Sequence, residues 1–144
     1  MAVRTKVKRT RGTVLIDSNV LLDIVTDDPE WGEWSFSAVG EAASHRALAI
    51  NAVIYAEVSV SFATAEDLER VLPASIERLD IPYAAAFLAG KSFRRYRKAG
   101  GLRTSTLPDF FIGAHAAVTG MALLTRDVLR YRTYFPELAL ISPD

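Results

Sequence analysis

The segment Thr13–Asp23, TVLIDSNVLLD, constrains the fold of this chain more than any other. Three apolar residues, Val14-Leu15-Ile16, run directly into Asp17, and a polar pair leads into a second apolar run. An apolar run bounded by turn-forming residues predicts a buried strand, and Ser18 or Asn19 is the expected N-cap of the following helix. Asp17 is therefore predicted where a strand ends and a helix begins. In open parallel α/β sheets, ligands bind at that edge.

The rest of the chain alternates between short apolar runs and helical patterns. Further strands are predicted at 47–50, 121–124 and 138–141, with a short extended piece at 76–81. Further helices are predicted at 33–45, 52–63, 65–72, 83–99, 109–118 and 127–134. Periodicity alone does not separate helix from strand at 52–63, and we choose helix because a parallel sheet needs a crossover there. This alternation predicts an α/β domain with a mostly parallel central sheet.

The composition fits one ordinary globular domain. The chain has 144 residues, of which 50% are hydrophobic and 24% charged, so an intrinsically disordered chain is excluded. No apolar run reaches the roughly 20 residues that span a bilayer, and the N-terminus lacks the apolar block of a signal peptide. The absence of cysteine excludes disulfides and thiolate zinc sites. We therefore expect a cytoplasmic protein that makes no membrane contact.

Charge is balanced over the whole chain, with 17 basic and 17 acidic residues, but its distribution is uneven. Residues 1–12, MAVRTKVKRTRG, hold five basic side chains and no acid. This segment is either a solubilising arm, an extension produced by start-site choice, or an arm that contacts nucleic acid. We divide the chain into a basic, flexible arm at 1–12 and a folded domain at 13–144.

Four acids stand in apolar company close after predicted strands or at a helix start: Asp17, Glu57, Asp109 and Asp127. Three have simple structural alternatives, since Asp17 and Asp127 could each cap a helix and Asp109 could stabilise a first turn through the helix dipole. Glu57 is harder to explain in this way. Its neighbours three and four positions away on a helix include no Lys or Arg, and an unpaired carboxylate on an apolar face is costly.

The four acids are better explained together. Carboxylates about 4 Å apart repel by roughly 4 kcal/mol per pair at an effective dielectric constant of about 20, so a chain that gathers them needs a cation or must protonate some of them. Oxygen ligands without cysteine favour Mg²⁺ or Mn²⁺ over zinc. Such an ion supplies a water nucleophile and neutralises charge on a phosphoryl group. The pattern therefore predicts phosphodiester hydrolysis.

Four motifs, VLIDSNVLLD, VIYAEVSVSF, LPDFFIGAHA and LLTRDVLRYRTYFPELALISP, resemble those of the PIN-domain ribonucleases, and in particular the VapC toxins of type II toxin–antitoxin pairs. The resemblance covers residues 13–143. It implies a PIN-like three-layer α/β/α fold with an acidic cluster at the carboxyl edge of the sheet. It also implies Mg²⁺- or Mn²⁺-dependent endoribonuclease activity that leaves 5′-phosphate and 3′-hydroxyl ends.

The resemblance also assigns roles to the acids. Asp17 and Asp109 correspond to the central metal ligands, and Glu57 to an acid that binds metal through water or orients the nucleophile. Asp127 corresponds to a more variable acid that supports a second ion. Two departures stand against the pattern: the extension before Thr13 is long, and the segment after Glu57 is unusually apolar.

Two kinds of residue are expected around the metal site. Asn19 and Thr125 lie two positions from an acid and are predicted to border it. The basic side chains predicted to bind RNA are Arg94, Arg95, Arg97, Lys98, Arg103 and Arg126. The segment between residues 81 and 108 carries basic side chains and no acid. Its positive charge would offset the repulsion between the carboxylates and an RNA backbone, although a solvated helix face is the simpler alternative. Tyr96 either stacks on a base or packs internally, and Arg126 either contacts the scissile phosphate or neutralises Asp127.

Partners follow from the resemblance and not from the residues alone. Apolar surface at 20–25 and 31–36 is compatible with the homodimer and the antitoxin-binding groove that the resemblance implies. The leading hypothesis is a metal-dependent endoribonuclease toxin that acts on RNA and is neutralised by a cognate antitoxin. The alternatives are a receiver-like signalling or binding domain, a metal phosphatase with an aspartyl nucleophile, and a catalytically inactive PIN-like scaffold.

Overall fold

A five-stranded parallel sheet forms the centre of the molecule, in the order β3-β2-β1-β4-β5. The computed structural model describes residues 12–103 and 107–143. The strands are β1 (Thr13–Ile16), β2 (Ala47–Asn51), β3 (Glu77–Leu79), β4 (Ala122–Leu124) and β5 (Leu140–Ile141). β1 lies in the middle, with Leu15 opposite Ala49 of β2 on one side and Leu123 of β4 on the other. The predicted basic arm lies almost wholly outside the described residues.

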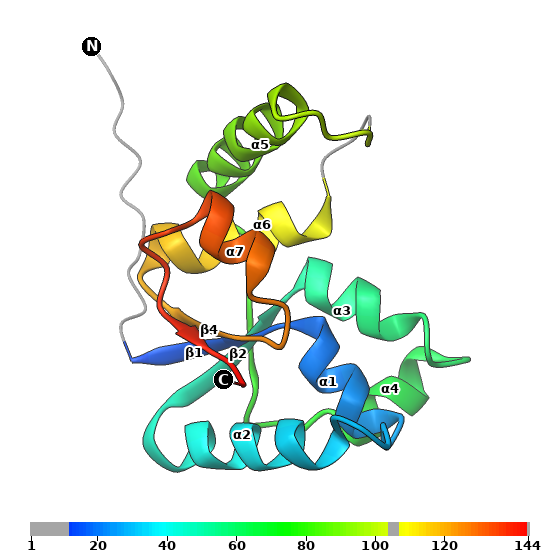
Figure 1. Cartoon of the computed structure of the whole chain (residues 1–144). Coiled ribbons are helices and arrows are strands. Elements are labelled where there is room, and N and C mark those ends of the chain that lie inside the picture. Colours follow the sequence, from blue (N-terminus) through cyan, green and yellow to red (C-terminus); the bar gives the residue numbers. More distant parts are fainter. Residues whose placement is uncertain (1–11, 104–106, 144) are drawn as a thin grey trace.

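Seven helices cover this sheet in the part of the chain that the structure describes. They are α1 (Ser18–Val25), α2 (Gly32–His45), α3 (Ala52–Ser59), α4 (Ala65–Val71), α5 (Tyr83–Lys98), α6 (Pro108–Thr119) and α7 (Leu129–Tyr134). Figure 1 shows α5, α6 and α7 above the sheet and α1 and α2 below it, so the predicted three-layer α/β/α arrangement is confirmed. None of these described helices is long and apolar enough to cross a membrane.

The predicted elements are all present, with differences at their ends. The helix predicted at 52–63 ends at Ser59, because Ser61 and Phe62 donate to carbonyls three residues earlier and tighten the chain into a turn. The helix predicted from Asp127 begins only at Leu129, and the last strand is shorter than predicted. The expected N-cap of α1 was wrong: Asp17, not Ser18 or Asn19, holds that position.

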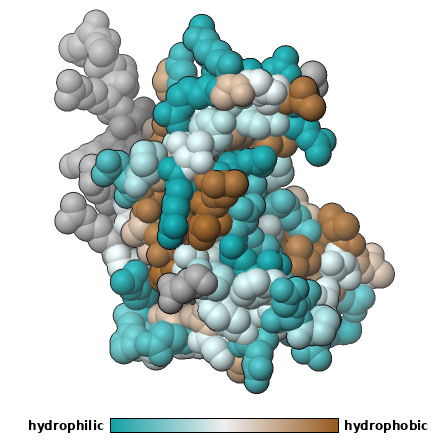
Figure 2. Space-filling view, viewed as in Figure 1, coloured by the Kyte–Doolittle hydropathy of each residue, from teal (hydrophilic) through white to brown (hydrophobic). Residues whose placement is uncertain are grey.

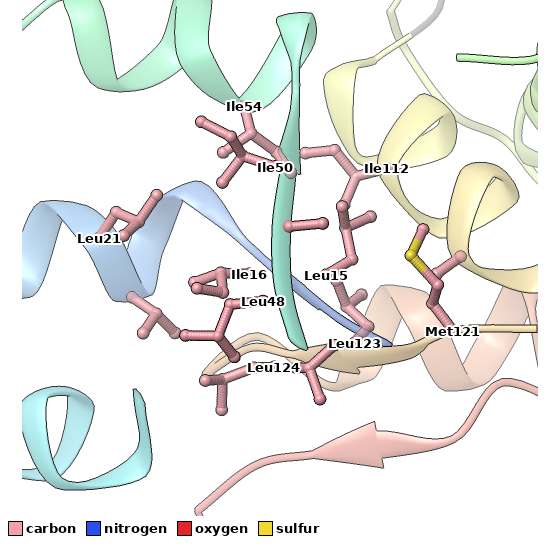
Figure 3. Close-up of a cluster of buried hydrophobic side chains, with 14 of the residues drawn as sticks. Leu15, Ile16, Leu21, Leu48, Ile50, Ile54, Ile112, Met121, Leu123 and Leu124 are labelled. Carbon is pink, nitrogen blue, oxygen red and sulfur yellow. The ribbon is translucent and has the colours of Figure 1, made fainter. Parts of the chain in front are cut away.

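The core consists of aliphatic side chains from the central strands and the helices on both faces (Figure 3). Leu15, Ile16, Leu123 and Leu124 are completely buried, as a strand covered on both faces requires. Figure 3 places Ile112 of α6 against this group from one side. Because β1 is buried on both faces, the backbone position of the residue that follows it is fixed.

Gly113 of α6 lies against the rings of Tyr131 in α7 and of Phe135, which follows α7. A Cβ atom built on Gly113 would lie 2.5 Å from the ring of Phe135 and 3.1 Å from that of Tyr131. A side chain here would force the ring of Phe135 to move and would crowd that of Tyr131. Only a glycine lets the two helices pack this tightly.

We therefore expect Gly113→Ala to destabilise the protein by about 1–3 kcal/mol, since overpacking outweighs the gain in helix propensity. The control is Gly90→Ala in α5, where the added Cβ meets nothing within 4 Å. That variant should be stabilised by about 0.5–1 kcal/mol. Urea unfolding of both variants measures the difference, and equal effects would contradict this account of the α6–α7 contact.

Candidate active site

Asp17 is held in place by both its backbone and its side chain. Its backbone N–H donates to the carbonyl of Leu124 (2.9 Å), which ties the end of β1 to β4. Its extended backbone (φ −66°, ψ 151°) makes it the N-cap of α1, and its Oδ1 accepts from the N–H of Ser18 at 2.8 Å. The side chain is only 2% exposed. A buried carboxylate therefore stands at the carboxyl edge of the central strand, as predicted.

Ser18 connects Asp17 to Glu57. The Ser18 hydroxyl donates to Oε1 of Glu57 at 2.8 Å, while its N–H donates to Asp17. Glu57 lies on α3, after β2, and is half-buried. The second predicted acid is thus held beside the first by a residue of the strand–helix turn.

Thr125 connects Asp17 to the end of β4. Its buried hydroxyl donates to Oδ2 of Asp17 at 2.8 Å and accepts from the N–H of Asp127 at 3.1 Å. The amide of Asn19 also approaches this hydroxyl, at 3.3 Å. Both predicted bordering residues therefore contact the site.

Asp127 itself is exposed and is joined to the network through its backbone. The alternative that Asp127 caps α7 is wrong, because Val128 holds that position.

Tyr131 of α7 connects Asp17 to Asp109. Its hydroxyl lies 3.0 Å from Oδ2 of Asp17 and 3.5 Å from Oδ1 of Asp109, so one hydroxyl bridges the two acids. Asp109 stands in the first turn of α6, the position that its structural alternative required. Arg130 donates to the other oxygen of Asp109 at 3.1 Å.

Burial raises the pKa values of Asp17, Asp109 and Glu57. Desolvation raises the pKa of Asp17 to about 6, against hydrogen bonds from Thr125 and Tyr131 that favour the charged form. Burial likewise raises the pKa of Asp109 and of Glu57. Repulsion between acids adds to these shifts: Asp109 acts on Asp17 and Glu57, and Asp127 acts on Asp109. The four acids therefore lie within electrostatic reach of one another.

The four acids are neighbours, but their side chains do not converge on one metal position. Among the described residues, no three acidic or histidine side chains stand close enough together to hold an ion as they are oriented. In this arrangement Glu57 accepts from Ser18, and Asp109 accepts from Arg130. The donor set is nonetheless all oxygen, the type that Mg²⁺ and Mn²⁺ bind. Its charge also fits a divalent cation, since one guanidinium contacts a group of four carboxylates.

Sequence reasoning missed Tyr131 and Arg130, which contact two of the acids directly. A weak signal was present, because both belong to the short helix between Asp127 and Phe135, within one or two turns of a proposed ligand. Periodicity does not reveal which side of that helix faces the sheet edge. Ser18 was considered only as a cap, although it is the contact that positions Glu57.

Arg126 does not neutralise Asp127. Its guanidinium forms a two-pronged ion pair with Asp23, a residue only 3% exposed, and lies over the ring of Trp31. Asp23 also accepts from the hydroxyl of Ser35 at 2.7 Å. This pair joins the end of β4 to α1 and α2. A contact between Arg126 and RNA stays a prediction.

The other basic candidates lie together at the end of α5 and beyond it. Figure 2 shows hydrophilic side chains gathered at the end of the molecule that α5 forms. Arg94 and Lys98 are exposed, whereas Arg95 donates to the carbonyl of Tyr134 and Arg97 to that of Arg103. These exposed residues stay predicted RNA contacts.

The family model of the PIN domain matches residues 14–135 of the chain. The chain belongs to the PIN domain family. That membership confirms the resemblance inferred from the four motifs and sets aside the receiver-like alternative. A comparison with curated protein sequences found no match.

Solved structures share this PIN fold at low sequence identity. A chain of VapBC2 from Rickettsia felis, crystallised with a DNA fragment from its promoter, is 18% identical with a TM-score of 0.70 over 92% of this chain and 99% of that chain. A chain of VapBC-1 from nontypeable Haemophilus influenzae is 18% identical with a TM-score of 0.69, over 90% of this chain and 97% of that chain. A chain of FitAcB from Neisseria gonorrhoeae is 20% identical with a TM-score of 0.64, over 89% of this chain and 96% of that chain. At such identities the likeness shows the fold.

Proposed function

We propose that this PIN-domain protein is a Mg²⁺- or Mn²⁺-dependent endoribonuclease. The observation that carries the proposal is the role of Asp17 as a buried centre, joined through Ser18 to Glu57, through Tyr131 to Asp109 and through Thr125 to Asp127. A structural N-cap needs none of these connections. A group of desolvated carboxylates held together at a sheet edge suits cation binding.

In this proposal Asp17 and Asp109 hold the ion, Glu57 binds it through water or orients the nucleophile, and Asp127 supports a second ion. A bound ion would neutralise charge at the phosphoryl group and lower the pKa of a water molecule. The chain itself orients these acids: Thr125 and Tyr131 fix Oδ2 of Asp17, and Ser18 fixes Glu57. Arg130 balances Asp109 before the ion binds. The basic end of α5 offsets the charge of the RNA backbone.

We propose further that the protein is the toxin of a VapBC-type pair in the cytoplasm, active as a homodimer and neutralised by an antitoxin. The fold shared with chains of VapBC complexes supports this role, as does a similar structure titled as a toxin–antitoxin complex from Klebsiella pneumoniae. Exposed apolar side chains, such as Phe36 of α2, provide surface for protein partners.

The test is cleavage of single-stranded RNA by the purified chain in Mg²⁺ or Mn²⁺, with EDTA as the control. We expect cleavage only with added metal, and products with 5′-phosphate and 3′-hydroxyl ends. Expression in bacteria should arrest growth. No cleavage in either metal would refute the nuclease proposal and leave the alternative of an inactive PIN-like scaffold.

A further inference from the structure

A cavity of about 460 Å³ opens beside the acidic site, between α5 and α7. Its lining residues are Tyr96, Asp127, Leu129, Arg130, Thr133 and Tyr134. A volume of this order is within the range of pockets that bind small ligands. Asp127 and Arg130 belong both to this cavity and to the acidic network, so the two sites are continuous.

Two aromatic rings and one guanidinium, that of Arg130, line this cavity, and a second guanidinium, that of Arg95, lies over one of the rings. The guanidinium of Arg130 lies 5.7 Å from the ring centre of Tyr96, and that of Arg95 lies 5.5 Å from the ring centre of Tyr134. Arg130 uses one nitrogen for Asp109, and its side chain is one-third exposed. Leu129 is 77% exposed and presents an apolar surface to the opening. Aromatic and apolar walls beside guanidinium groups suit a base attached to a phosphate.

The position of the cavity agrees with the charge of the surface around it. Asp127 and Arg130 lie on the α7 side of the cavity, next to the acids, and Tyr96 lies on its α5 side, in the helix whose last turn carries Arg95, Arg97 and Lys98. A larger cavity of about 550 Å³ exists next to α1 and α2, but Asp23, Asp27, Asp28 and Glu33 line it. Asp23 is paired with Arg126, and the other three carboxylates would repel a phosphodiester chain there. The smaller cavity is therefore the better place for RNA.

We infer that this cavity is a nucleotide subsite, which holds a nucleotide of the RNA strand next to the scissile bond, with Arg130 at its phosphate and Leu129 and the Tyr96–Tyr134 wall beside its base. This inference rests on the proposed ribonuclease function. It adds a substrate contact made by α7, the helix that also bridges Asp17 and Asp109 through Tyr131.

The test introduces a negative charge into the cavity by a substitution that leaves all four acids of the site in place. Thr133 is exposed on α7, and its hydroxyl donates to the carbonyl of Leu129 at 2.7 Å. Thr26 is a matched control, since it is exposed at the end of α1 and its hydroxyl donates to the carbonyl of Leu22 at 2.6 Å. Thr133→Glu and Thr26→Glu therefore make the same change in the same local setting, but only Thr133 lines the cavity.

We expect Thr133→Glu to raise the KM for single-stranded RNA in Mn²⁺ by about tenfold or more, with kcat changed by less than about threefold, because the added charge repels phosphate in the bound and transition states alike. Thr26→Glu should leave both constants within about twofold. Leu129→Ala, which removes apolar surface alone, should raise KM by about threefold. Melting temperatures of the three variants show that they are folded.

The possible results separate the two proposals. If the wild type cleaves RNA and Thr133→Glu behaves like Thr26→Glu, the subsite is refuted and the nuclease function stands. A fall in kcat with an unchanged KM would also refute the subsite, since it would mean a disturbance of the acids. If the wild type does not cleave RNA, the nuclease proposal fails and the subsite fails with it.

Discussion

Asp17→Asn is expected to lower metal-dependent RNA cleavage by about a thousandfold or more, since it removes the charge at the centre of the acidic network and with it several kcal/mol of transition-state stabilisation. The fold should survive. The asparagine oxygen can still accept from the N–H of Ser18, and the hydroxyl groups of Thr125 and Tyr131 can rotate to accept from the new amide.

Asp28→Asn is the matched control for this experiment. The carboxylate of Asp28 accepts from the N–H groups of Glu30 and Trp31, so it also organises a turn, but it has no contact with the acidic network. That variant should cleave RNA like the wild type. If Asp17→Asn kept more than about a tenth of the activity, Asp17 would be a structural cap and the site assignment would be wrong.

The second large effect concerns stability and pH. The folded-state pKa of Asp17 is raised from 3.8 to about 6 by burial, so the native protein holds this proton more tightly than the unfolded chain does. Raising the pH through that window therefore lowers the free energy of unfolding, by about 3 kcal/mol for a shift of roughly two pKa units. The loss is complete above the folded-state pKa.

Asp17→Asn carries no such charge, so in the absence of metal it should be more stable than the wild type by about 3 kcal/mol near pH 7.5 and nearly equal to it near pH 4. Urea unfolding at the two pH values measures this difference. A constant difference at both pH values would show that Asp17 titrates normally and is not desolvated.

Divalent metal should reverse the order of stability of the wild type and Asp17→Asn. A divalent ion that binds only the native acids stabilises the wild type, by about 2.7 kcal/mol when its concentration is a hundred times its dissociation constant. Millimolar Mn²⁺ should raise the melting temperature of the wild type and leave that of Asp17→Asn unchanged. An equal rise in both proteins would place the ion elsewhere.

Much of the fold could be predicted from the sequence because local signals and tertiary packing agree. Val14-Leu15-Ile16 is a short apolar run that the sheet buries on both faces, and Gly120 ends α6 in the left-handed conformation (φ 78°) that glycine favours. The exact helix ends were less predictable. The turn after Ser59, for example, follows from backbone hydrogen bonds that no periodicity encodes.

The sequence was sufficient to predict which acids form the candidate site, but not the hydrogen bonds and ion pairs that connect them. The position of Asp17 follows from one strand end, and parallel strands bring such ends to one edge. The bridge from Tyr131 to Asp17 spans 114 residues and depends on how α7 packs on α6, where Gly113 removes the obstacle to close approach. The pairing of Arg126 with Asp23 likewise depends on the rotation of α1, which the sequence leaves open between several faces.

The short helix α1 has a consequence for how the site moves. Its cap is Asp17, its first residue holds Glu57, its second contacts Thr125, and its Asp23 holds the side chain of Arg126. Arg126 also donates its backbone N–H to Asn19. These eight residues therefore contact groups from two other segments, α3 and the turn after β4, so a displacement of α1 would shift these groups together.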